Sequence, residues 1–261
     1  MLAHVHIMKT AGQTVRGILR QSFVGTHCDL LARRGATTRD LIWARRFYPE
    51  LKSIAGHGVL PHANLHQAEP SLRYFTFLRD PVQRCVSHYQ FSFPKKRHFP
   101  PFEEWIREHA NFQTQILCGT EDACRAIEVL EKRIEFVGLV ERFNESLILL
   151  QQWCGDQTLD LHYQSINVAT DNTIKKRLLS DPKVMALIEE FHQQDCEVFR
   201  YARDVIYPRQ TKQFGPLLAQ AVADLEAELP GPTILSFQQF VAAAKRNVLY
   251  KPMTKFLHRA A

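Results

Sequence analysis

AHVHIMKTAGQT, at residues 3–14, is the segment from which the fold can first be inferred. Val5 and Ile7 alternate with histidines, and this period-two pattern predicts a short strand over residues 3–8. A turn of small residues follows, and apolar residues then recur at helical spacing over residues 15–23. The chain therefore opens with a strand, a loop and a helix.

Two more strand–helix units follow the same plan. Residues 74–78 are rich in aromatic strand formers, and after them Asp80 can cap a helix that has Pro81 in its first turn. Residues 136–140 form another apolar strand, and Asn144 is the expected N-cap of the helix behind it. Because strands alternate with helices, we predict an α/β fold with a P-loop-like parallel sheet flanked by helices.

The rest of the chain is expected to be helical. Four stretches have helical periodicity: residues 101–132, 171–207, 215–229 and 235–248. The length of 261 residues suits a single domain over residues 1–261, with a core over about 3–205 and a helical C-terminal extension over about 206–261. The extension carries basic residues, for which a packed amphipathic helix is the simpler interpretation and membrane-surface contact the alternative: Lys245, Arg246, Lys251, Lys255 and Arg259.

Composition excludes several classes of protein. The net charge of +6 fits an anionic ligand, but no concentrated basic stripe indicates nucleic-acid binding. No apolar run reaches the roughly 20 residues of a membrane span, and no signal peptide is recognisable. We therefore expect a cytoplasmic protein, or one of the Golgi lumen if a membrane anchor precedes this sequence. The six cysteines lack zinc-ribbon spacing; a Cys118–Cys124 bridge is conceivable, but reduced thiols are the favoured interpretation.

Two loops carry the chemistry of anion binding. The loop at residues 9–14 opens a helix, so backbone N–H groups and the helix dipole can hold a phosphate or sulfate beside the Lys9 ammonium. It is not a Walker A loop, because GxxxxGK[ST] is absent and the lysine comes first. Arg79 ends a strand, where open α/β sheets bind ligands, and Ser87 lies on the next helix. The two loops together predict a ligand with two anionic groups.

These stretches resemble the sulfotransferases that use 3′-phosphoadenosine 5′-phosphosulfate (PAPS). Residues 6–14 resemble their 5′-phosphosulfate loop, usually PKTGGTS, and RDPVQRCVSHY at residues 79–89 resembles their 3′-phosphate motif, RDPxxRxxSxY. FVGLVERF at residues 136–143 resembles a segment of the Golgi-type carbohydrate branch, which includes heparan sulfate 2-O-sulfotransferase. The resemblance covers about residues 3–205, and a bacterial member of this branch is expected.

The resemblance implies a role for each matched residue. Lys9 would contact the 5′-phosphosulfate and stabilise the leaving phosphate, while Arg79 and Ser87 would hold the 3′-phosphate. The residues that would wrap the phosphosulfate are Thr10, Ala11, Gly12, Gln13 and Thr14. The sequence departs from the family at Met8, where proline is usual, and at Gln13, where a small hydroxyl residue is usual. Gln13 would have to act through its amide.

The acceptor hydroxyl needs a base, and histidine suits this task near neutral pH. His57 lies between the two phosphate motifs and is flanked by glycines, which allow a ligand to approach closely. It also matches a Gly-His segment that carries the base in the carbohydrate branch. Other histidines have weaker claims: His62 and His66 are secondary candidates, His4 and His6 are expected to be structural, and His88 is expected to pack on its helix.

The predicted reaction is sulfuryl transfer from PAPS to a hydroxyl of a carbohydrate-like acceptor, with no metal. A small-molecule kinase with a P-loop-like core and a catalytically inactive binding module of the same fold remain as alternatives.

Two further segments are expected to be loops. The basic segment at residues 93–101 is either solvated or lies beside the acceptor, and residues 164–168 have a weak claim to contact the nucleotide.

Overall fold

A parallel sheet forms the centre of the molecule in the computed structural model, which describes residues 1–32, 35–63, 65–93, 99–155, 159–164, 172–230 and 236–257. In these residues the sheet has five strands in the order β2-β3-β1-β4-β5, and each pair is parallel. The strands are β1 (Leu2–Val5), β2 (His27–Asp29), β3 (Ser53–Gly56), β4 (Arg73–Leu78) and β5 (Ile134–Leu139). The predicted α/β class with a parallel sheet is confirmed.

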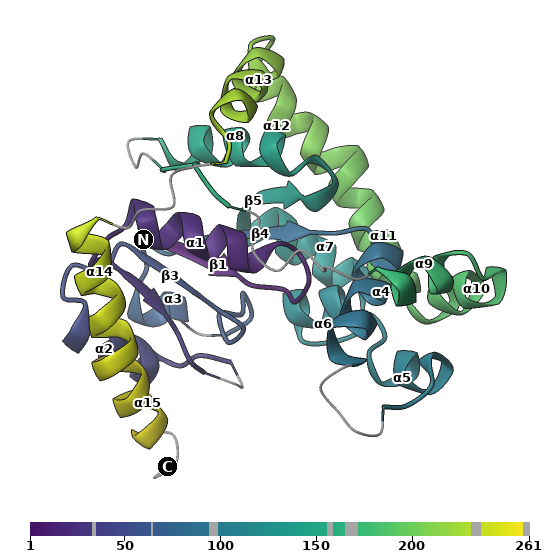
Figure 1. Cartoon of the computed structure of the whole chain (residues 1–261), viewed down its shortest axis with the longest axis horizontal. Coiled ribbons are helices and arrows are strands. Elements are labelled where there is room, and N and C mark those ends of the chain that lie inside the picture. Colours follow the sequence, from purple (N-terminus) through teal and green to yellow (C-terminus); the bar gives the residue numbers. More distant parts are fainter. Residues whose placement is uncertain are drawn as a thin grey trace.

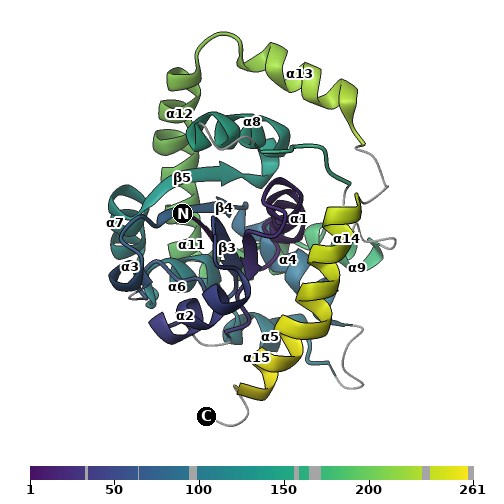
Figure 2. The ribbon, with the colours of Figure 1, turned by 90° about the vertical axis from the view of Figure 1, so that its left-hand side faces the viewer.

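Helices flank this sheet, with α1 and α8 on one side and α3 and α7 on the other (Figures 1 and 2). The helices before β5 are α1 (Gly12–Ser22), α2 (Thr38–Phe47), α3 (Leu65–Ala68), α4 (Pro81–Ser92), α5 (Phe102–Glu108), α6 (Phe112–Cys118) and α7 (Ala123–Lys132). After β5 come η2 (Val140–Arg142), α8 (Phe143–Cys154), α9 (Thr173–Leu179), α10 (Pro182–Phe191), α11 (Gln193–Tyr201), η3 (Ala202–Ile206), α12 (Tyr207–Phe214), α13 (Leu218–Glu228), α14 (Phe237–Ala244), η4 (Lys245–Tyr250) and α15 (Lys251–Leu257). The predicted helical C-terminal part is confirmed.

The strand order creates a switch point between β1 and β4. The chain leaves β1 towards β2 on one side of the sheet and leaves β4 towards β5 on the other. Open α/β sheets bind ligands in the crevice that such a reversal opens at the carboxyl ends of the strands. The loops after β1 and β4 are the two for which the sequence predicts anion binding.

Several local predictions were wrong. The first strand ends at Val5 rather than at residue 8, because the chain turns there and the Ile7 amide donates to the Val5 carbonyl. The short strands β2 and β3 were not predicted. Asn144 does not cap α8, which begins one residue earlier; its side chain instead joins the Tyr163 hydroxyl to Glu226. The cap of α4 was predicted correctly, since the Asp80 carboxylate accepts from the Gln83 amide.

The C-terminal helices pack on both edges of the sheet. The Gln210 side chain on α12 donates to the Val137 carbonyl and accepts from the Val137 amide of β5. At the opposite edge, Arg246 of η4 lies 3.8 Å from the Asp29 carboxylate of β2, and Tyr250 packs its ring against Phe47 and Tyr48 next to it. Both edges of the sheet are therefore covered by segments from the end of the chain.

Three further findings bear on the sequence analysis. All six cysteines are free thiols, including the buried Cys118 and the exposed Cys124. None of the described helices is both long and apolar enough to cross a bilayer. Parts of three predicted features lie outside the described residues: residues 94–98 of the basic loop, residues 165–168 of the second loop, and Arg259.

Candidate active site

A pocket of about 300 Å³ lies where the loops after β1, β3 and β4 meet. Eight of the nine residues predicted for the site line it: Lys9, Ala11, Gly12, Gln13, Thr14, His57, Arg79 and Ser87. His6, Met8, Phe91 and Val140 complete the lining. The fold thus brings together predicted residues that lie up to 78 positions apart in the sequence.

The ninth residue, Thr10, does not line the pocket but stabilises the loop from the protein interior. Its side chain is fully buried, and its hydroxyl donates to the Ile7 carbonyl at 2.9 Å. The backbones on either side of it are left-handed, with φ of 71° at Lys9 and 58° at Ala11. Thr10 therefore fixes a tight turn, and the structure places it outside the pocket lining.

The start of α1 faces this pocket. No side chain caps the helix N-terminus, so the amides of its first turn and the helix dipole offer a site for an anion. A Cβ atom on Gly12 would overlap the His6 ring, and only glycine lets that ring approach. Gly12 thus shapes the wall of the pocket.

Arg79 connects the two predicted anion-binding loops. Its Nη1 donates to the Lys9 carbonyl at 3.2 Å. Its backbone is held by the side chain of Gln113, which accepts from the Arg79 amide at 3.0 Å and donates to the Arg79 carbonyl at 2.8 Å. Gln113 extends the strand-like hydrogen bonding past the end of β4. No pattern in the sequence points to this residue, because it lies 34 positions away in a helical stretch.

A buried acidic group supports Gln113 in turn. The Asp195 carboxylate accepts from the amides of Gln113 and Thr114 at 3.2 and 2.8 Å, and from the Thr114 hydroxyl at 2.8 Å. Arg84 on α4 lies 3.9 Å from the same carboxylate, and both side chains are fully buried. This ion pair joins the helix that carries Ser87 to the segment that positions Arg79.

His57 and His6 form a stacked pair at the pocket wall. Their ring centroids are 4.1 Å apart, and His57 Nδ1 donates to the His6 carbonyl at 3.0 Å. Because a carbonyl only accepts, this bond assigns the proton of neutral His57 to Nδ1 and leaves Nε2 with a lone pair. Partial burial lowers the pKa of His57, so the ring is neutral near pH 7. It has the tautomer and charge that a general base needs.

Besides Arg79, two cations lie at or near the pocket: Lys9, which lines it, and Lys175, which does not. The Lys9 ammonium lies over the Phe91 ring, 4.2 Å from its centroid. Lys175 on α9 has its pKa lowered by burial and by the charge of Arg79. Its backbone amide is held by Gln90 of α4 at 3.0 Å. The charge of Lys175 therefore acts on Arg79, although Lys175 itself lies outside the pocket lining.

Of the other histidines weighed in the sequence analysis, only His6 lines the pocket. His62 bonds through Nδ1 to the Leu117 carbonyl, and His66 lies beside Arg133. His4 is fully buried and stacks on Phe75, as expected of a structural residue. His88 packs in edge-to-face contact with Trp105, also as expected. The exception is His6, which lines the pocket as well as supporting the strand end.

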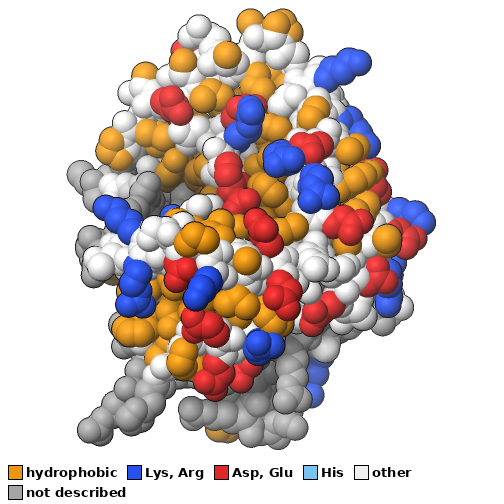
Figure 3. Space-filling model, turned by 90° about the vertical axis from the view of Figure 1, so that its right-hand side faces the viewer, with side chains coloured by type: hydrophobic (Ala, Val, Ile, Leu, Met, Phe, Trp, Pro, Cys, Tyr) orange, Lys and Arg blue, Asp and Glu red, His pale blue; other side chains and the backbone are white. Residues whose placement is uncertain are grey.

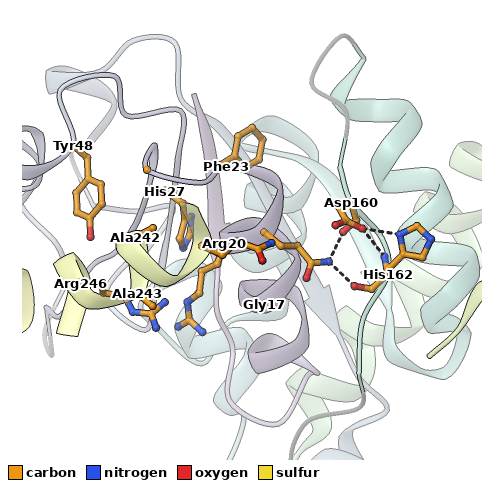
Figure 4. Close-up of a pocket in the computed structure, with 13 residues that line it drawn as sticks. Gly17, Arg20, Phe23, His27, Tyr48, Asp160, His162, Ala242, Ala243 and Arg246 are labelled. Atoms are coloured by element: carbon orange, nitrogen blue, oxygen red, sulfur yellow. Dashed lines mark hydrogen bonds and ion pairs between the residues drawn. The ribbon is translucent and has the colours of Figure 1, made fainter. Parts of the chain in front are cut away.

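A second cavity, of about 320 Å³, lies between α1 and α14 (Figure 4). Arg20 and Arg246 point into it from opposite sides, while Gln21 bonds to the carbonyls of Asp160 and His162. None of the residues predicted for the site lines it. The candidate active site is therefore the first pocket.

Similarity to known proteins is slight. No family model matches the chain. No curated protein matches it either. Among solved structures, it is similar to a sulfotransferase from Alicyclobacillus acidocaldarius, with 12% sequence identity and a TM-score of 0.39 over 72% of this chain and 94% of that chain. A likeness this distant carries no argument about activity, so function has to be inferred from the pocket itself.

Proposed function

We propose that this protein transfers a sulfuryl group from PAPS to a hydroxyl of a carbohydrate-like acceptor. One observation carries the proposal: the two loops with sulfotransferase-like sequence line a single pocket and are joined by the hydrogen bond from Arg79 to the Lys9 carbonyl. PAPS has anionic groups at both ends of one adenosine. A pocket that holds it needs two cationic sites within reach of each other.

The residues present fit such a donor. Lys9 and the uncapped start of α1 suit the phosphosulfate end, while Arg79 and Ser87, with Lys175 nearby, suit the 3′-phosphate. The described lining includes no carboxylate that would repel these groups. Bound PAPS would supply a sulfuryl group whose bond to the 5′-phosphate is ready to break.

The chain would contribute a base and an electrostatic clamp. His57 Nε2 accepts the proton of the acceptor hydroxyl as its oxygen bonds to sulfur and the bond from sulfur to the phosphate oxygen breaks. His57 Nδ1 stays bonded to the His6 carbonyl, which holds the ring in place. Lys9 and the amides of α1 stabilise the negative charge that grows on the departing phosphate.

Calorimetry with adenosine 3′,5′-bisphosphate and a transfer assay with labelled PAPS on a glycan panel test the proposal. We expect the bisphosphate to bind and at least one glycan to become labelled, with no requirement for magnesium. Absence of bisphosphate binding would overturn the proposal. Binding without transfer to any acceptor would favour an inactive module, and magnesium-dependent turnover of ATP would favour a kinase.

A further inference from the structure

The C-terminal helical segment, residues 237–257, packs on the protein through one face only. Tyr250 and Thr254 are buried on this inner face, and Thr254 accepts a hydrogen bond from the Trp43 indole at 3.1 Å. Arg246 reaches inward to within 3.8 Å of the buried carboxylate of Asp29. Figures 1 and 2 place α14 and α15 at the outside of the molecule, along α1 and α2. The segment is fixed in orientation, so its other face is turned to solvent.

That outer face is apolar. Seven of the twelve large hydrophobic side chains that are exposed among the described residues lie on this segment, and each is 47% to 81% exposed. They are Phe237, Phe240, Val241, Val248, Leu249, Met253 and Phe256. On the face in Figure 3, by contrast, charges of both signs alternate with small apolar areas. An apolar stripe of this length needs a partner.

A wide turn keeps this stripe continuous. Residues 245–250 form the π-helical segment η4, which fits an extra residue into the turn. Each added residue rotates the remainder of the helix by roughly 100° around its axis. Without that rotation, Met253 and Phe256 would lie well to the side of Phe237 and Val241. With it, all four come to the same side of the segment, away from the buried Tyr250.

The charge of the segment identifies the partner. Residues 229–261 contain five lysines and arginines and no aspartate or glutamate. Of these, Arg246 faces Asp29 and Lys245 lies over the Tyr48 ring, whereas Lys255 is exposed. A helix with one large apolar face and only basic charges is the pattern of a helix that lies in the interface of an anionic bilayer. We propose that the outer face of residues 237–257 docks this protein on an anionic phospholipid surface.

A second copy of the chain fits this face less well. In a symmetric dimer the outer face would pair with itself, and two segments that each carry positive charge and no acidic residue would be brought together. An anionic bilayer offers the complementary charge together with an apolar interior for the phenylalanines. The geometry therefore favours lipid, and a dimer becomes an outcome that the experiment can detect.

Co-sedimentation with vesicles tests the proposal. We expect the full chain to bind vesicles of phosphatidylcholine mixed with phosphatidylglycerol, to bind pure phosphatidylcholine much more weakly, and to be released by high salt. The double variant F240S/F256S should bind the anionic vesicles about 100-fold more weakly, because two large apolar side chains no longer enter the bilayer. Both side chains are exposed, so its thermal unfolding should match that of the wild type.

L217S is the matched control. Leu217 is 70% exposed but lies outside the segment, before α13, so this variant should bind vesicles like the wild type. The proposal fails if the wild type does not bind anionic vesicles, if pure phosphatidylcholine binds equally well, or if F240S/F256S binds unchanged. A dimer in solution that F240S/F256S dissociates would also overturn it, in favour of a second copy.

Discussion

Lys9 combines a cationic side chain with a strained backbone. Its left-handed φ of 71°, like that of Ala11 at 58°, costs on the order of 1 kcal/mol for a residue that has a side chain. The Thr10 hydroxyl bond and the Arg79 contact with the Lys9 carbonyl hold this conformation. The turn places the ammonium and the start of α1 on the same pocket.

Lys9→Ala should therefore slow turnover far more than it weakens nucleotide binding. The ammonium would act mainly on charge that grows in the transition state, and loss of one such group costs about 100- to 1,000-fold in kcat. Affinity for adenosine 3′,5′-bisphosphate should fall by less than about tenfold. Steady-state kinetics with calorimetry measures both. Equal losses in kcat and affinity would show that Lys9 only binds the nucleotide.

The pH profile depends on His57. Its pKa lies below the usual 6.5 because of partial burial, so the neutral ring that accepts a proton persists to lower pH. The logarithm of kcat/KM, which reports groups of the free enzyme, should rise with pH along an acidic limb centred below 6.5. His57→Gln should abolish transfer and leave bisphosphate affinity within about twofold of the wild type. An active His57→Gln enzyme would move the base to another residue.

Gln113 supports the pocket indirectly, because its side chain holds the backbone of Arg79 just after β4. Gln113→Leu removes both hydrogen bonds to the Arg79 backbone, and two lost bonds at a buried site are worth about 1–3 kcal/mol. We expect a lower melting temperature together with about tenfold weaker binding of the bisphosphate, because Arg79 loses its fixed position.

Gln210 provides the matched control, since its amide makes the same pair of bonds to Val137 of β5 outside the pocket lining. Gln210→Leu should lower the melting temperature by a similar amount and leave bisphosphate affinity unchanged. If both variants bind the bisphosphate like the wild type, Gln113 supports only the fold. If neither the wild type nor either variant binds it, the proposed function itself is at fault.

Elements with local signals could be predicted from the sequence. Strands β4 and β5 have six residues each and clear apolar character, and the cap of α4 follows from Asp80 and Pro81. Strands β2 and β3 have only three and four residues, too few for a period to show. Lys9 and Arg79 could be singled out because a cation in a strand-end loop is a local feature, and His57 because glycines flank it and it matches a Gly-His segment of the sulfotransferases. Gln113 and Lys175 could not, because only the folded chain brings them to the site.

At the scale of the whole molecule, Asp29 ties the start of the chain to its end. Its fully buried carboxylate on β2 accepts hydrogen bonds from Arg16 and Arg20 of α1 and lies 3.8 Å from Arg246 of η4. Burial alone would raise the pKa of Asp29, but the His27 hydrogen bond and the charges of Arg20 and Arg16 hold it well below 3.8. The edge of the sheet, helix α1 and the C-terminal segment are joined at this one group.

A depressed carboxyl pKa stabilises the folded state above the pKa of the unfolded chain, and this stability is lost as pH falls through the folded value. The free energy of unfolding should therefore fall steeply with decreasing pH below about 4, as denaturant titrations at several pH values would show. Asp29→Asn should lose about 3 kcal/mol at neutral pH, because the partly buried arginines around it lose their counter-charge. Its free energy of unfolding should also fall less steeply with decreasing pH.

The variant Arg246→Ala removes the contact between the C-terminal segment and Asp29 without removing the bonds that Asp29 makes to α1. Asp29 keeps its bonds to Arg16 and Arg20, so the sheet should retain its protection against hydrogen exchange. The C-terminal segment loses its one ionic contact with Asp29, and the amides of residues 237–257 should exchange faster. Faster exchange across the whole sheet would instead mean that Arg246 stabilises the entire fold. If the free energy of unfolding of Asp29→Asn falls with decreasing pH as steeply as that of the wild type, other carboxylates govern acid unfolding.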